Sequence, residues 1–98
     1  MTITKQQNGG ALILTLDGRL DTVTSPELEK ELNASLNGAD SLILDFSRLD
    51  YISSAGLRVL LSAHKAMSGK GGMKVKNVNE IVREVFDVTG FADVLAIE

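Results

Sequence analysis

Short, nearly continuous apolar runs alternate along this chain with segments whose apolar residues recur every three or four positions. Residues 11–16 and 42–46 are such runs, which are typical of strands covered on both faces of a sheet. Residues 1–6 alternate weakly, and Asn8-Gly9-Gly10 predicts a hairpin turn between them and the next strand. The pattern also predicts two short strands, at residues 73–76 and within residues 91–98.

The first helical segment starts near residue 25. Ser25 is expected to cap it, and Pro26 suits the first helical position. Asn37-Gly38 is expected to end it. The predicted buried face consists of Leu28, Leu32 and Leu36.

Two further helices are predicted, one from about Ser54 to Ser68 and one that starts at Asn77 or Asn79 and stops at Gly90. The expected inner face of the former is Leu57, Leu60, Leu61, His64 and Met67. The expected inner face of the latter is Ile81, Val82, Val85 and Phe86.

Residues 17–21 and 47–50 contain few apolar side chains and are expected to break the strands before them. Strands and helices then alternate, apart from the opening hairpin. This order predicts one α/β domain over residues 1–98, with a mixed, mostly parallel sheet, an N-terminal antiparallel hairpin and about three main helices.

Composition narrows the functional classes. The net charge is −3 and no basic run occurs, which argues against nucleic acid or an anionic membrane as a partner. The chain has no cysteine, no apolar stretch of about 18 residues and no signal-peptide pattern, so we expect a cytoplasmic protein.

Catalytic residues are scarce. His64 is the only histidine, and its place on the predicted inner face favours a structural role. Ser54 precedes it by ten residues on one helix, roughly 15 Å, so the two cannot pair as nucleophile and base. Gly69-Lys70-Gly71-Gly72 lacks the residues of a phosphate-binding Walker loop. We therefore expect no enzymatic activity, no cofactor and no metal site.

The junction at residues 50–58 joins a strand to the longest helix and holds two adjacent hydroxyls, Ser53 and Ser54. A serine at a helix start can cap the helix, and the same place is favourable for a phosphate. Helix phase puts Ser54 one turn before Arg58. We expect Ser54 both to cap the helix and to present its hydroxyl to a partner, with Ser53 as the second candidate.

Small and apolar residues also occupy the outward side of the predicted helix. They are Ala55, Val59, Ser62 and Ala66, bordered by Arg58 and Lys65. This strip is either a docking surface for a partner or a surface covered by a neighbouring segment. Asp21 follows a predicted strand, and it either lies near Ser54 at the same edge of the sheet or bonds within its own turn.

These residues resemble the STAS family, which includes bacterial anti-sigma factor antagonists, over essentially the whole chain. The resemblance rests on three motifs. They are Gly18-Arg19-Leu20-Asp21, Leu42–Phe46 with Tyr51-Ile52-Ser53-Ser54-Ala55-Gly56-Leu57, and Gly71-Gly72-Met73 with Val85-Phe86 and Thr89-Gly90-Phe91. The chain departs from well-known members at Ser53, Ala55 and Arg58, and it ends where many members add a helix.

The resemblance implies a switch in transcription regulation. The unmodified antagonist would bind an anti-sigma factor that is also a serine kinase, and so release a sigma factor. Phosphorylation at Ser54 would end binding, and a PP2C-type phosphatase would restore it. The residues expected to contact the partner are Asp21, Ser53, Ala55, Arg58, Val59 and Ser62. The alternatives are a non-phosphorylated STAS subunit of a signalling or lipid-transport complex, and a small hydrolase or nucleotide-using enzyme.

Overall fold

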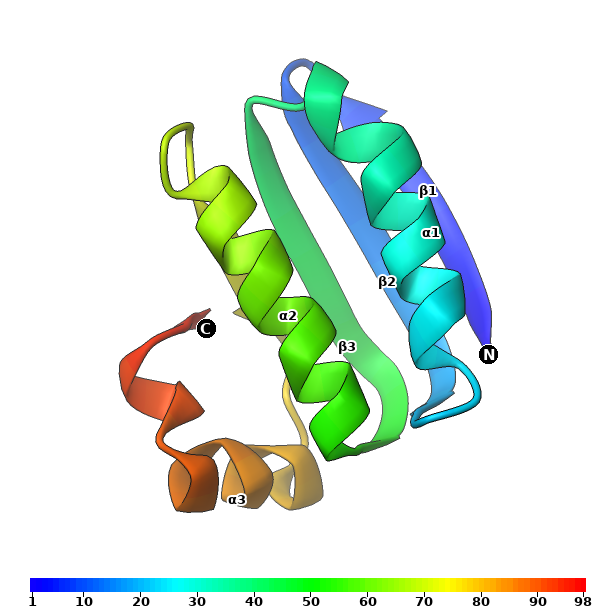
Figure 1. Ribbon diagram of the computed structural model, residues 1–98, viewed down its shortest axis with the longest axis vertical. Helices are drawn as coiled ribbons and strands as arrows, with labels where there is room; N and C mark the ends of the chain where they lie inside the picture. The colour runs from blue at the N-terminus through cyan, green and yellow to red at the C-terminus, as the bar shows by residue number, and fades with distance from the viewer.

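The computed structural model describes all 98 residues as one α/β unit (Figure 1). Five strands and three α-helices follow one another, with short 3₁₀ turns at Leu36–Gly38 and Phe91–Asp93. The elements are β1 (Thr2–Asn8), β2 (Ala11–Leu20), α1 (Ser25–Ser35), β3 (Ser41–Ile52), α2 (Ser54–Met67), β4 (Met73–Lys76), α3 (Glu80–Thr89) and β5 (Ala96–Ile97).

The strands form one sheet in the order β1-β2-β3-β4-β5. Only β1 and β2 are antiparallel, and the remaining pairs are parallel. The predicted fold class is therefore confirmed, including the hairpin and the three main helices. The last edge strand is β5, which pairs with β4.

Helices α1 and α2 lie side by side on one face of the sheet, and α3 lies beyond the start of α2 (Figure 1). Alternate residues of β2 and β3 point toward the two helices and are buried, while their neighbours Ile13 and Ile43 are only half-buried. The prediction that these strands are covered on both faces is wrong. The continuous apolar runs reflect a sheet that is sealed on one face and partly exposed on the other.

Strands β2 and β3 both run further than the sequence predicts. Residues 17–20 and 47–52 continue the ladder, in which Arg19 pairs with Tyr51 and Leu20 with Ile52. The pairing register of β2 with β3 shifts between Thr15 and Asp17 and again after Gly18, so the ladder continues past these residues. Gly18 takes a φ of 118°, which suits glycine. The extended strands carry the buried side chains of Leu20, Leu49 and Ile52 to the edge where α2 begins.

Three details of the helices also differ from the predictions. Ser25 is the first residue of α1 rather than its cap, and its hydroxyl donates to the carbonyl of Asp21. Leu36 falls in the 3₁₀ turn and is half-buried. Ile81 was expected on the inner face of α3 but points outward and is 60% exposed. Only Val82 and Phe86 of that helix are buried in the core.

Asn79, rather than Asn77, caps α3 by accepting a bond from the backbone N–H of Val82 at 2.8 Å. Its side-chain amide also donates to the carbonyl of Leu49 at 2.8 Å. This second bond ties the start of α3 to the distal part of β3. Gly90 ends the helix with a φ of 82°, as expected for a glycine C-cap.

Candidate functional site

The start of α2 divides its two serines between two tasks. Ser53 is the N-cap, and its hydroxyl oxygen accepts a bond from the backbone N–H of Gly56 at 3.4 Å. Ser54 is the first helical residue, its side chain makes no hydrogen bond, and it is exposed. The expectation that Ser54 itself caps the helix is wrong. The cap leaves the Ser54 hydroxyl free.

Close packing fixes this helix start against the sheet. The backbone N–H of Ser53 donates to the carbonyl of Leu20 at 2.9 Å. A Cβ atom at Gly56 would lie 2.8 Å from the side chain of Leu20 and 2.9 Å from that of Ile52. Only glycine allows the first turn of α2 to approach the strands this closely, and that approach sets where Ser54 stands.

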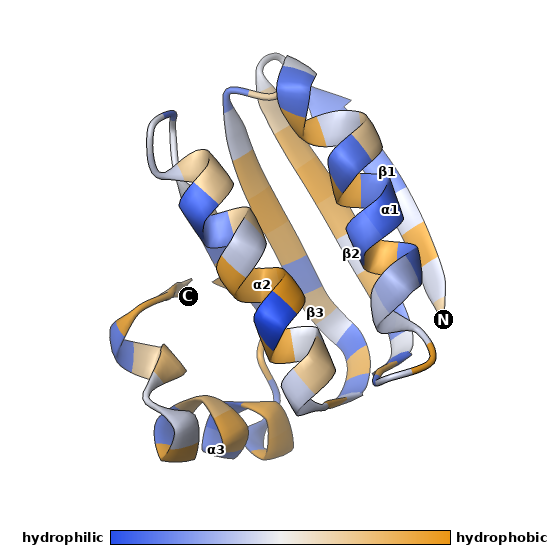
Figure 2. Ribbon diagram, in the orientation of Figure 1, coloured by the Kyte–Doolittle hydropathy of each residue, from blue (hydrophilic) through white to orange (hydrophobic).

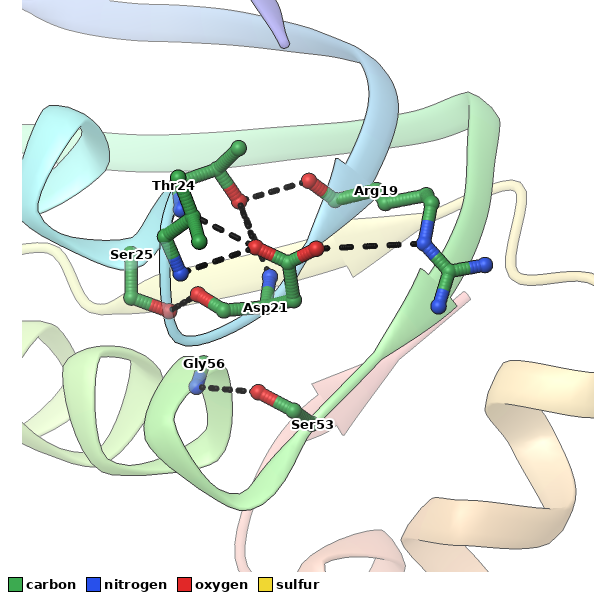
Figure 3. Close-up of polar contacts among 7 residues, drawn as sticks. Arg19, Asp21, Thr24, Ser25, Ser53 and Gly56 are labelled. Carbon is green, nitrogen blue, oxygen red and sulfur yellow. Dashed lines mark hydrogen bonds and ion pairs between the residues drawn. The ribbon is translucent and has the colours of Figure 1, made fainter.

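Asp21 lies in the turn between β2 and α1, which Figure 3 shows beside the capped start of α2. Its Oδ1 accepts bonds from the backbone N–H groups of Val23 and Thr24, both at 3.0 Å. The Thr24 hydroxyl donates to the carbonyl of Arg19 and accepts from the N–H of Asp21. The interpretation that Asp21 bonds within its own turn is confirmed, and the turn also lies near the serines.

These bonds affect the charge of Asp21. The backbone N–H of Thr24, above all, holds the pKa of the Asp21 carboxyl below its ordinary value. The Arg19 guanidinium adds an exposed ion pair at 3.8 Å and lies over the ring of Tyr51, 4.5 Å from its centroid. The turn therefore carries a fixed carboxylate with one oxygen used by the backbone.

A groove runs between α1 and α2 toward their N-terminal ends, beside the turn that precedes α1. It encloses about 350 Å³. It is lined by Thr22, Ser25, Pro26, Glu29, Ala55, Arg58, Val59 and Ser62. Of the predicted partner-contacting residues, Ala55, Arg58, Val59 and Ser62 therefore meet in one hollow.

The outward strip predicted on this helix is thus not an open face. Val59 is only 7% exposed, and Ala55 is half-buried, because α1 packs alongside α2. Arg58 and Ser62 are exposed on the α2 side of the groove. The interpretation that a neighbouring segment covers the strip is confirmed for Val59 and Ala55, while the role of the strip as a docking surface stays a prediction.

Sequence reasoning missed the wall of the groove that α1 contributes. Pro26 and Glu29 of α1, and Thr22 in the turn before it, lie far from residue 54 in sequence, and no pattern distinguishes them from a solvated face. It also missed Val23, an 82% exposed apolar side chain in the Asp21 turn. An apolar valine in a predicted turn next to Asp21 was the one feature of the sequence that could have indicated an exposed contact residue.

The remaining candidate groups do not assemble. His64 is half-buried on α2, and its Nδ1 has no hydrogen-bond partner. The structure contains no group of three histidine, cysteine or acidic residues placed to hold a metal ion. No helix is long and apolar enough to cross a membrane. The candidate site therefore consists of the groove between α1 and α2 and the exposed Ser54.

The sequence model of the STAS domain matches residues 2–98. The chain belongs to the STAS domain family. It is 38% identical over 99 residues to BtrV of Bordetella bronchiseptica, covering 99% of this chain and 85% of that protein. It is 31% identical over 94 residues to the anti-sigma-B factor antagonist of Bacillus subtilis, covering 94% of this chain and 85% of that one.

Solved structures agree on the fold. An anti-sigma factor antagonist from Mycobacterium paratuberculosis matches with a TM-score of 0.89 at 23% identity, over 98% of this chain and 83% of that one. The phosphorylated form of SpoIIAA from Bacillus matches with a TM-score of 0.76 at 17% identity, over 99% of this chain and 91% of that one. The STAS resemblance of the sequence is confirmed, and the relatives are named as anti-sigma factor antagonists.

Proposed function

We propose that this protein is a cytoplasmic anti-sigma factor antagonist that works by partner switching. Its unmodified form binds an anti-sigma factor that is also a serine kinase, and this binding frees a sigma factor. Phosphorylation of Ser54 ends the binding, and a PP2C-type phosphatase removes the phosphate. The observation that carries the proposal is the exposed, unbonded hydroxyl of Ser54 at the start of α2, next in sequence to Ala55 of the groove.

The phosphate cannot act by melting the helix. A negative charge at a helix N-terminus stabilises the helix by about 0.3–1 kcal/mol. The modification instead adds about −1.5 to −2 charges to the contact surface, where like charges or a desolvated phosphate cost several kcal/mol. A penalty of ~3 kcal/mol weakens binding about 100-fold.

Each predicted contact residue then has a physical role. Val59 and Ala55 form the apolar wall of the groove, and Ser62 and Arg58 supply its polar margin. Ser53 holds the helix start in place, while Asp21 orders the turn that carries Val23. A partner that covers Ser54 would contact this turn and the groove together.

Arg58 places an unpaired positive charge near Ser54. It makes no ion pair in the structure and lies one helical turn after Ser54. Its guanidinium can therefore approach a phosphate on Ser54 without breaking another contact. We expect Arg58→Ala to raise the second pKa of phosphoserine 54, measured by ³¹P NMR titration of the phosphorylated protein.

The kinase reaction tests the proposal directly. The purified anti-sigma kinase encoded in the same genome is incubated with this protein and ATP, and the product is read by intact mass. A gain of one phosphate that is lost in Ser54→Ala and kept in Ser53→Ala supports the proposal. An unchanged mass with every such kinase contradicts it and favours a non-phosphorylated STAS subunit of a signalling or lipid-transport complex.

A further inference from the structure

Helix α3 has an exposed apolar face outside the groove. Ile81 and Val88 are 60% and 81% exposed, and the half-buried Val85 lies between them. Their spacing of four and three residues puts all three side chains on one face of the helix. They surround a shallow depression of about 320 Å³, which Glu84 and Thr89 also line. Figure 2 shows the hydrophobic residues of α3 near the lower end of the molecule.

The flank of this apolar stripe is acidic. Glu80 and Glu84 are one turn apart on α3, are exposed, and make no ion pair. Asp87 extends the same flank and is paired with Arg83 at 3.8 Å. Two free carboxylates beside three aliphatic side chains are complementary to an apolar surface bordered by lysine or arginine.

A second copy of this chain fits the stripe poorly. In a two-fold pair, each residue near the symmetry axis meets its own copy. Glu84 flanks Val85, the middle residue of the stripe, so an antiparallel pairing of two α3 helices would bring the two Glu84 carboxylates together with no cation between them. Like charges at such an interface are unfavourable.

The stripe is also too small to hold a partner alone. Three aliphatic side chains offer far less than the roughly 800 Å² that each side of a standard interface buries. The start of α3 does, however, lie at the same end of β3 as Ser54. Asn79 ties the start of α3 to Leu49 near the end of β3, and α2 begins two residues after β3 ends, at Ser54.

We propose that the α3 stripe (Ile81, Val85 and Val88 with Glu80 and Glu84) is a second contact surface for the partner that binds at Ser54. It takes an apolar segment of that partner bordered by basic side chains. This inference rests on the proposed function, because it assigns the stripe to the same anti-sigma kinase. The stripe would help to select the partner, and phosphorylation of Ser54 would leave the stripe unchanged.

The test measures the affinity of the anti-sigma kinase that binds the wild-type protein, using calorimetry. Val88→Arg removes an apolar contact and places a cation against the partner's basic border, so we expect at least tenfold weaker binding. Glu84→Gln should weaken binding less and reduce its dependence on salt. Gln6→Arg adds the same charge on exposed β1, at the far edge of the sheet from β4 and β5, and should bind like wild type.

Amide chemical shifts provide the second readout. Adding the unlabelled kinase to ¹⁵N-labelled protein should shift the amides of Ile81, Val85 and Val88 along with those of Ser53 and Ser54. Wild-type affinity of Val88→Arg, or unchanged α3 amides, overturns this proposal while loss of binding in Ser54→Asp still supports the proposed function. If the wild-type protein binds no anti-sigma kinase, both proposals fail.

Discussion

At the residue scale, two adjacent serines have different structural roles because the helix begins between them. Ser53 has extended backbone and a hydroxyl committed to Gly56, whereas Ser54 is helical and unbonded. The sequence could place both at a helix start, but the choice of cap depends on where β3 ends. That end is set by pairing with β2, which no local pattern reports.

This division of tasks predicts unequal stability effects. Ser53→Ala removes the cap and should lower the free energy of unfolding by about 1 kcal/mol, whereas Ser54→Ala should change it by less than about 0.5 kcal/mol. Urea denaturation followed by circular dichroism measures both. Equal losses for the two variants would contradict the assignment of the cap.

The lowered pKa values of two carboxyl groups predict how the free energy of unfolding depends on pH. The bond from Thr24 lowers the pKa of Asp21, and the bond from the Asn77 amide lowers the pKa of Asp45, each from an ordinary value of 3.8. Because the folded pKa values are the lower ones, the stabilising contribution is present above pH 3.8 and is lost as the pH falls through them. Carboxyl ¹³C titration by NMR should give both pKa values below 3.8. Values at or above 3.8 would show that these bonds do not favour the ionised forms.

At the element scale, the sequence predicted which segments are helices and strands, and it failed where strands continue through polar residues. Asp17-Gly18 and Ser47-Arg48 have the composition of turns, yet a register shift keeps both strands in the sheet. The added length of β2 and β3 is what carries Leu20 and Ile52 beneath Gly56. The position of the site depends on this irregular part of the sheet.

The contact at Gly56 predicts a specific defect. Gly56→Val places side-chain atoms where Leu20 and Ile52 already lie, and overpacking of this kind costs typically about 1–3 kcal/mol. Thermal denaturation measures the loss, and weaker kinase binding should accompany it because the first turn of α2 must move. Gly69→Ala is the matched control, since a Cβ there has nothing within 4 Å. A Gly56→Val variant as stable as wild type would contradict the close approach of α2 to the strands.

At the scale of the whole molecule, the C-terminal part of β3 connects the segments that carry the proposed contact surfaces. The end of β3 bonds to Leu20, which leads into the Asp21 turn, it continues into α2, and Leu49 accepts a bond from Asn79 at the start of α3. From the sequence, the parallel sheet offered two alternatives for Asp21, a place near Ser54 or bonds within its own turn, and the structure shows those bonds. The sequence could not predict the groove, because the wall from α1 depends on how two helices pack, nor the outward face of α3.

The central claim is that charge at Ser54 controls binding without changing the fold. The most direct measurement compares wild type with Ser54→Asp for affinity to the anti-sigma kinase and for melting temperature. We expect binding to weaken by up to about 100-fold while the melting temperature stays nearly unchanged, since an acidic residue in the first turn is tolerated by the helix. Unaltered affinity in the aspartate variant, or loss of binding that is explained by unfolding, would contradict the account.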